Sequence, residues 1–177
     1  AEFLHLEDGL FFADDRLSGN GYCAAVKKGS GAIDKISEGL AEISESEYGF
    51  QRIKGRKYSI PAEVGADDLP QEAGLETSFV DFNKGCYLGQ EVMARIHAMG
   101  KVRNSAVVVQ GTTPAPCSLP LRILDNGKKV GKVKTQFTLA DGQGWIGAAI
   151  IHEKALPSLA KSELTLENSS ATIHPLN

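Results

Sequence analysis

Apolar and polar residues change their spacing several times along the chain, and each change predicts a different element. Apolar residues alternate through 2–12 as in one strand or a strand pair, and Tyr22–Val26 has the pattern of a further short strand. After a glycine-rich break, apolar residues recur at helical spacing, which predicts an amphipathic helix. The residues at this spacing are Ile33, Ile36, Leu40 and Ile43.

A second helix is predicted from about Glu45 to Ile53. Ser44 followed three residues later by Glu47 matches a capping box, in which each side chain bonds the other residue's free amide. A long irregular stretch punctuated by proline and glycine follows, from Pro61 to Gly74, and stretches of this length are usually functional or specifically packed. A further helix is expected over 88–97.

After Gly100 the pattern changes to short strands. Asn126-Gly127 lies between two alternating runs and predicts a tight hairpin, because both turn residues tolerate positive φ. Short strands at this spacing hide their edges by closing, so a small Greek-key β-barrel is expected. The predicted strands are Ser105–Gln110, Leu119–Leu124, Lys129–Thr135, Trp145–Ile151, Leu164–Glu167 and Ala171–His174. The chain is therefore expected to be of the α+β class, with one domain over 1–100 and a second over 101–177.

Composition narrows the function classes. No apolar run approaches the roughly 20 residues of a membrane span, so no membrane partner is expected. The formal net charge of −3 gives no broad positive field for nucleic acid, which makes nucleic-acid binding an unlikely function. The short basic clusters Lys27–Lys28, Lys54–Lys57 and Lys101–Arg103 are interpreted as solvated surface.

The three cysteines, Cys23, Cys86 and Cys117, are widely spaced and odd in number. This argues against a disulfide framework, fits a reducing compartment, and offers no complete metal or cluster site within one chain. The first residues lack the basic and apolar regions of a secretory signal.

Chemistry is concentrated at Lys84-Gly85-Cys86, where a turn presents a thiol beside an ammonium group just before a helix. A cation and a helix N-terminus both stabilise a thiolate, so Cys86 is the cysteine with a reason to be reactive. A small buried hydrophobe at a tight turn is the alternative interpretation. Glu91 and Arg95 have the spacing of an ordinary helix-surface pair, and His97 falls where a histidine complements the helix dipole.

The string Lys84-Gly85-Cys86-Tyr87-Leu88-Gly89-Gln90-Glu91 resembles the K-G-C-[YF]-x-G-Q-E signature of the YgfZ family, a relative of the glycine-cleavage T-protein, and matches it at every fixed position. Other segments agree in order. They are Ala13-Asp14-Asp15-Arg16-Leu17, Tyr48–Ile53, Ile60-Pro61, Leu69-Pro70-Gln71-Glu72 and the β-rich tail. No serine-hydrolase, zinc-protease, P-loop or dinucleotide motif occurs.

The resemblance implies part of a GcvT-like three-lobed folate-binding domain over 1–100, followed by the small β-barrel. Family members carry a further region before the equivalent of Ala1, so a missing N-terminal region or a partner chain is expected to complete the pocket. The implied ligand is tetrahydrofolate or a one-carbon derivative, and the implied partners are iron–sulfur cluster proteins. Cys86 would be the catalytic thiol. The implied folate-binding residues are Lys84, Tyr87, Gln90, Glu91, Arg52, Arg95 and Arg16.

The implied function is support of iron–sulfur cluster assembly or repair by a tetrahydrofolate-binding protein, and whether it catalyses a reaction is left open. One alternative is a folate-dependent aminomethyltransferase of the T-protein type. Another is a non-catalytic folate-fold module that needs a partner chain. The expected location is the cytoplasm, or the mitochondrial matrix in a eukaryote.

Overall fold

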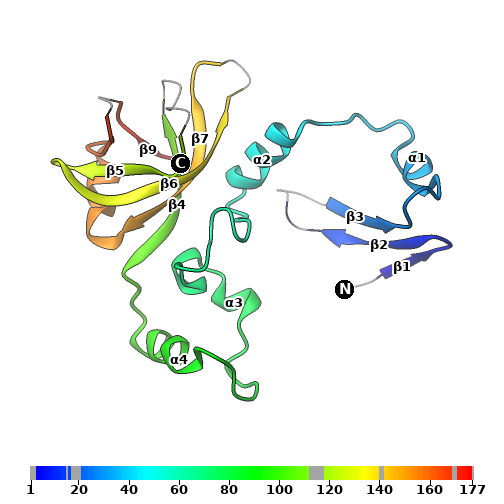
Figure 1. Ribbon diagram of the computed structural model, residues 1–177, viewed down its shortest axis with the longest axis horizontal. Coiled ribbons are helices and arrows are strands. Elements are labelled where there is room, and N and C mark those ends of the chain that lie inside the picture. The colour runs from blue at the N-terminus through cyan, green and yellow to red at the C-terminus, as the bar shows by residue number, and fades with distance from the viewer. Residues whose placement is uncertain are drawn as a thin grey trace. The chain divides into compact units, whose positions relative to one another are not determined.

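The computed structural model describes residues 3–14, 16, 21–111, 118–139, 142–168 and 171–176. The chain divides into two compact units, Ala1–Lys57 and Tyr58–Asn177. Each carries its own sheet, so the α+β class expected from the sequence is confirmed (Figure 1). Within the described residues, every helix is too short or too polar to cross a membrane.

The first unit contains a three-stranded antiparallel sheet. Its strands, β1 (Phe3–Leu6), β2 (Gly9–Asp14) and β3 (Gly21–Val26), lie in chain order, which confirms the predicted strand pair and third strand. The rings of Phe11 and Tyr22 stack across β2 and β3 with centroids 5.0 Å apart. Tyr22 nevertheless remains 65% exposed, so this side of the sheet presents apolar surface.

The two helices of the first unit follow the sheet. Helix α1 (Ala32–Ser37) is shorter than predicted, because Glu38 turns to an extended conformation and Gly39 has a φ of 78°. The prediction that this helix carries Leu40 and Ile43 is therefore wrong.

Helix α2 (Glu45–Lys54) begins at Glu45 as predicted, and the hydroxyl of its N-cap Ser44 accepts from the Glu47 amide at 3.1 Å. The Glu47 carboxylate accepts from the Gln51 side chain at 2.7 Å. The N-cap half of the capping box is thus formed, and Glu47 stabilises the next turn of the helix.

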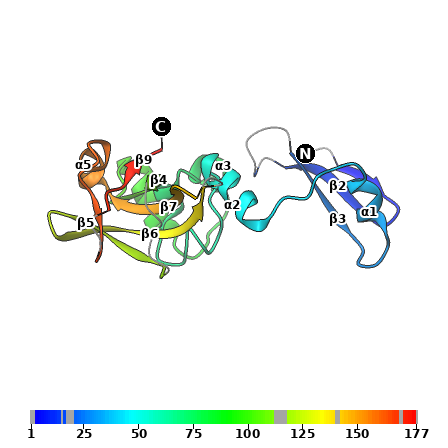
Figure 2. The ribbon, with the colours of Figure 1, turned by 90° about the horizontal axis from the view of Figure 1, so that it is seen from above.

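The second unit is built on a six-stranded antiparallel sheet in the order β8-β5-β6-β7-β4-β9. Three consecutive strands, β5, β6 and β7, are neighbours, and β4 returns beside β7, which is the Greek-key arrangement expected from the sequence. Figures 1 and 2 show that this sheet curls strongly. The strands are β4 (Asn104–Gly111), β5 (Leu121–Asp125), β6 (Lys128–Thr138), β7 (Trp145–His152), β8 (Thr165–Leu166) and β9 (His174–Pro175).

The two ends of this sheet are joined by two C-terminal segments, 164–168 and 171–175. The first segment pairs with β5 and the second with β4. The two segments also bond each other, because the Ile173 amide donates to the Leu164 carbonyl at 3.1 Å and Thr165 bridges Thr172. These two paired segments therefore close the sheet and cover both of its edges.

The hairpin between β5 and β6 turns at Asn126 and Gly127, with φ values of 49° and 78°. Both values are positive, as a two-residue turn of this hand requires, and the predicted hairpin is confirmed.

The core of the second unit lies inside the curled sheet. Strand β7 is buried along nearly its whole length, and Trp145 occupies the space opposite Gly111, where an added Cβ would meet the indole Nε1 at 2.5 Å. Helix α5 (Leu156–Ala160) contacts β9 and adds Leu159 to the core (Figure 2). The other core residues are Val109, Leu121, Ile123, Val133, Ala149, Ile151, Ala155, Leu164, Leu166 and Ile173.

The irregular stretch predicted around 61–74 packs on the sheet through three carboxylates. Glu63, only 1% exposed, accepts from the Thr135 hydroxyl at 2.9 Å. The Lys134 ammonium donates to Asp68 at 2.6 Å, and the Asn104 side-chain nitrogen donates to Glu72 at 2.9 Å. The stretch is thus specifically attached to β4 and β6, and it leads through a 3-10 helix (Pro70–Ala73) into α3 (Glu76–Phe79).

Candidate functional site

The segment Lys84–Glu91 leads into helix α4 (Gln90–Met99), so its last two residues form the first turn of the helix. Gly89 precedes the helix with a φ of 88°, a left-handed conformation that favours glycine. The predicted helix over 88–97 is therefore confirmed, with its start and end each displaced by two residues.

Gln90 holds this segment together from within. Its side-chain oxygen accepts from the Tyr87 amide at 3.1 Å, and its side-chain nitrogen lies 3.9 Å from the sulfur of Cys86. The Lys84 ammonium lies over the Tyr87 ring, 4.6 Å from its centroid, which is a cation–π arrangement. The predicted site residues Lys84, Cys86, Tyr87 and Gln90 thus form one bonded turn.

This turn is displayed at the surface of the unit. Cys86 is exposed, so it is not the small buried hydrophobe considered from the sequence. Leu88 is completely exposed, and Val92 is 53% exposed one turn further along α4. Solvent or a partner can therefore reach the thiol and the apolar side chains beside it.

Helix α4 is attached to the rest of the unit on its other side. Met93 is buried, and its carbonyl accepts from the Gln71 side chain at 3.4 Å. His97 stacks on Phe82 with ring centroids 4.0 Å apart, and its Nδ1 lies 3.8 Å from the Glu76 carboxylate. These contacts fix the loop before the signature against the end of α4.

Glu91 and Arg95 are both exposed on α4. Among the described residues no ion pair joins them, so the surface pair predicted from their spacing is not formed. Their charges stay available to a ligand.

Arg16 and Arg52 belong to the first unit. Arg16 pairs with Asp14, and its side-chain hydrogen bonds hold the pKa of the Asp14 carboxyl below its usual range. Arg52 is 9% exposed and donates to the Lys57 carbonyl at 2.6 Å, which holds the chain that follows α2 against the helix. Both guanidinium groups therefore have structural bonds within their own unit.

The remaining cysteines lie away from the signature in the sequence. Cys23 lies half-buried on β3, and Cys117 lies outside the described residues. Within the part of the chain that the structure describes, no cluster of cysteine, histidine and carboxylate side chains has the geometry to hold a metal ion.

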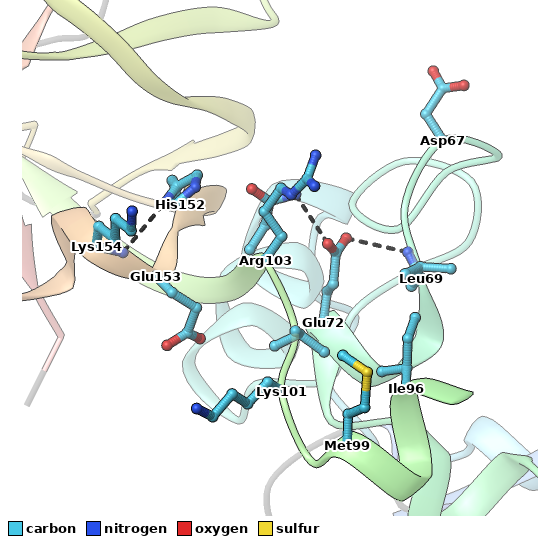
Figure 3. A pocket seen from close by; sticks show the side chains of 12 residues that line it. Asp67, Leu69, Glu72, Ile96, Met99, Lys101, Arg103, His152, Glu153 and Lys154 are labelled. Carbon is cyan, nitrogen blue, oxygen red and sulfur yellow. Dashed lines mark hydrogen bonds between the residues drawn. The ribbon is translucent and has the colours of Figure 1, made fainter. Parts of the chain in front are cut away.

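A pocket of about 660 Å³ lies at the far end of α4 from the signature (Figure 3). Its walls come from the end of α4, the connection to β4, the end of β7 and the irregular stretch. The lining residues are Asp67, Leu69, Glu72, Ile96, Met99, Lys101, Val102, Arg103, Asn104, His152, Glu153 and Lys154.

Sequence reasoning missed this pocket and the carboxylates that build its walls. Lys101–Arg103 was interpreted as solvated surface, because His152 and Lys154 lie far from it in the sequence. Their meeting depends on the register of β4 and β7, in which Asn104 is paired with His152. The pocket could have been predicted from the sequence only if that strand register had been known.

Comparisons with known proteins bear on both the fold and the family of the chain. The solved structure of the glycine cleavage system aminomethyltransferase T from Bartonella henselae matches 97% of this chain and 49% of its own, with a TM-score of 0.74 and 13% identity. No protein-family model matches the chain.

Curated relatives match over shorter stretches. The tRNA-modifying protein YgfZ of Sodalis glossinidius is 30% identical over 134 residues, which cover 72% of this chain and 41% of the relative. The human mitochondrial iron–sulfur cluster assembly factor IBA57 is 38% identical over 88 residues, covering 47% of this chain and 23% of the relative. The chain therefore spans less than half the length of the curated relatives it matches.

The fold places this chain in the class of proteins built like the glycine-cleavage aminomethyltransferase. Within that class its sequence belongs to the YgfZ-type family.

Proposed function

We propose that this protein binds tetrahydrofolate and supports the assembly or repair of iron–sulfur clusters. The observation that carries the proposal is the exposed turn Lys84–Glu91, in which one bonded segment presents a thiol, an ammonium group and a carboxylate. The names of the relatives support the cellular role, since one group is called tRNA-modifying and the other iron–sulfur cluster assembly factor.

Glu91 is the side chain that we assign to the pterin. A pterin presents an amide-like edge of donors and acceptors, which a carboxylate complements with two bonds. Gln90 also has an acceptor oxygen, but that oxygen already accepts from the Tyr87 amide, and the side-chain nitrogen lies beside the Cys86 sulfur. We therefore propose that Gln90 shapes the turn and that Glu91 contacts the ligand.

The glutamate tail of the folate requires cations. Lys84 and Arg95 lie on either side of Glu91 in the sequence and supply them, with Tyr87 offering a ring for stacking. Arg16 and Arg52 stay predicted contacts from the first unit. Cys86 is proposed as the reactive thiol that transiently ligates iron as a thiolate, or takes sulfane sulfur from a donor protein's persulfide, whose own cysteine leaves as a thiolate.

Calorimetric titration with tetrahydrofolate tests the binding step. Glu91→Gln is expected to weaken binding about tenfold, because a bond to a charged group contributes about 1.5–3 kcal/mol. Glu45→Gln is the matched control, since Glu45 is an exposed acid in the first turn of α2 and is expected to change nothing. Because the chain spans only part of its relatives, the titration is made alone and with the uncovered part of the Sodalis protein. Failure to bind in both settings would contradict the folate proposal.

Folate binding is expected of an aminomethyltransferase as well, so a cellular test is needed to separate the two. The activity of iron–sulfur enzymes is measured in cells that depend on this protein, with Cys86→Ser compared with Cys23→Ser. Loss only with Cys86→Ser supports the cluster role. Full activity of both variants would remove Cys86 from the mechanism.

We propose that any effect on tRNA passes through iron–sulfur proteins. The net charge of −3 does not favour tight, sequence-independent binding to RNA phosphates. Gel-shift titration with bulk tRNA is expected to show no salt-dependent complex, and a tight one would contradict this route.

A further inference from the structure

The pocket at the end of α4 has a wall of hydrogen-bond donors that the structure leaves without acceptors. Lys101, Arg103 and Lys154 are all on this wall, and their side chains make no ion pair or hydrogen bond with the described residues (Figure 3). The carboxylates of Asp67, Glu72 and Glu153 also line the pocket and match the three cations in number, so the case for an anion rests on the unused donors.

His152 adds a fourth donor. Its Nδ1 accepts from the Lys154 amide at 3.1 Å, so the proton of the neutral ring is on Nε2. Nε2 then donates to whatever occupies the space beside it.

Two of the acidic residues of the pocket bond donors other than these cations. Glu72 already accepts from the Leu69 amide at 3.2 Å and from Asn104, and Glu153 accepts from the Ser105 hydroxyl. Asp67 is exposed and lies in Figure 3 on the opposite side from His152 and Lys154. On the β-strand side of the pocket, the groups without a hydrogen-bond partner are therefore mainly donors.

These donors are held on a rigid frame. Asn104 and His152 are paired in register at the ends of β4 and β7, and the Glu153 amide donates to the Arg103 carbonyl at 3.0 Å. The backbone, and not the side chain, of Arg103 makes that bond. The guanidinium is consequently free to serve a ligand without supporting the fold.

The other wall is apolar. Its side chains are Leu69, Ile96, Met99 and Val102, and Met99 is 61% exposed. A volume of about 660 Å³ falls within the usual range of small-molecule sites. An apolar wall facing a donor-rich wall fits a ligand that has an apolar body and a charged end.

We propose that this pocket binds a small organic anion that carries a phosphate or carboxylate group on an apolar body. The site is separate from the signature turn, and the proposal does not depend on folate binding there. Phosphate and carboxylate groups both accept hydrogen bonds from lysine and arginine, so an experiment must distinguish which of the two anionic groups the pocket binds.

The test is an NMR titration of the isotope-labelled chain with phenyl phosphate, benzoate, inorganic phosphate and benzyl alcohol. Phenyl phosphate or benzoate is expected to shift the amides of Arg103, His152 and Lys154 at millimolar concentration. The tighter of the two identifies the charged group. Inorganic phosphate, without the apolar body, and benzyl alcohol, without the charge, are expected to bind more weakly.

Variants then separate the two walls. Arg103→Gln is expected to weaken phenyl phosphate about tenfold, and Arg103→Lys to retain most of the binding, since a charged bond is removed only in the first. Met99→Gln is expected to weaken phenyl phosphate and leave inorganic phosphate unchanged. Lys129→Gln removes an equal charge from exposed β6 and is the control.

The proposal is overturned if neither phenyl phosphate nor benzoate shifts these amides, or if Arg103→Gln and Lys129→Gln bind equally. Equal binding of phenyl phosphate and inorganic phosphate would also overturn it, because the apolar wall would then have no role. Each variant's spectrum is compared with the wild type, so a folding defect is recognised from the amides outside the pocket.

Discussion

Lys134 on β6 and Asp68 in the irregular stretch form an ion pair with a nitrogen–oxygen distance of 2.6 Å. Their side chains are 13% and 5% exposed, so the pair is largely removed from water. Asp68 also accepts from the Gly65 amide at 2.8 Å, which fixes its carboxylate. This pair attaches the stretch that precedes the signature to the curled sheet.

Removing one partner of this pair is expected to destabilise the protein strongly. Lys134→Met leaves the Asp68 carboxylate buried without its cation, and such losses are about 3–5 kcal/mol. Lys129→Met on the exposed part of the same strand is expected to change the free energy of unfolding by less than about 0.5 kcal/mol. Urea denaturation measures both values, and equal effects would show that the pair contributes nothing.

The same pair is expected to shape the acid limb of the stability curve. Burial raises the pKa of Asp68, but the bonds from Lys134 and Gly65 outweigh it and hold the pKa below its ordinary value of 3.8. A lowered pKa means that this stabilisation is complete above pH 3.8 and is lost as the pH falls below it. Asp68→Asn should therefore flatten the loss of stability in that acid range. An unchanged slope would contradict this assignment.

Gly111 is expected to tolerate no side chain. An added Cβ would meet the Trp145 ring at 2.5 Å, and both residues belong to paired strands that cannot separate easily. Gly111→Ala should lower the free energy of unfolding by about 1–3 kcal/mol, as overpacking does. Gly85→Ala is the matched control, because nothing lies within 4 Å of its added Cβ. Thermal unfolding followed by circular dichroism compares the two.

Gln90 is expected to control the signature turn through two separable contacts. Gln90→Ala removes the acceptor of the Tyr87 amide, whose hydrogen exchange should become about fivefold faster for a bond of about 1 kcal/mol. Gln90→Glu retains an acceptor and should preserve that protection. Both variants lose the donor beside the Cys86 sulfur, so both should change the rate of thiol alkylation. Unaltered exchange in Gln90→Ala would show that the bond does not persist in solution.

The sequence predicted those elements whose signals are local. Ser44 marked the start of α2 because its hydroxyl caps the nearest free amide, and Asn126-Gly127 marked a hairpin because positive φ is needed there. The first helix was predicted too long for a related reason. Apolar spacing continued to Ile43, but Gly39 in a left-handed conformation ended the helix earlier.

The candidate site divides in the same way. The signature turn was predicted from contiguous residues, and its main bonds span only three or four positions. The donor-rich pocket joins Arg103 to Lys154, and the buried carboxylate of Glu63 reaches Thr135, so both depend on packing far apart in the chain. Neither the pocket nor the Glu63 contact has a local sequence pattern that predicts it.

The paired segments 164–168 and 171–175, which join both ends of the curled sheet, also determine when the sheet can close during synthesis. Strands β4 to β7 leave the ribosome first, but their two outer edges have no partner until these late segments emerge. The barrel-like sheet therefore cannot close during most of translation. Until then its open edges are the part of the nascent chain most in need of protection from other strands.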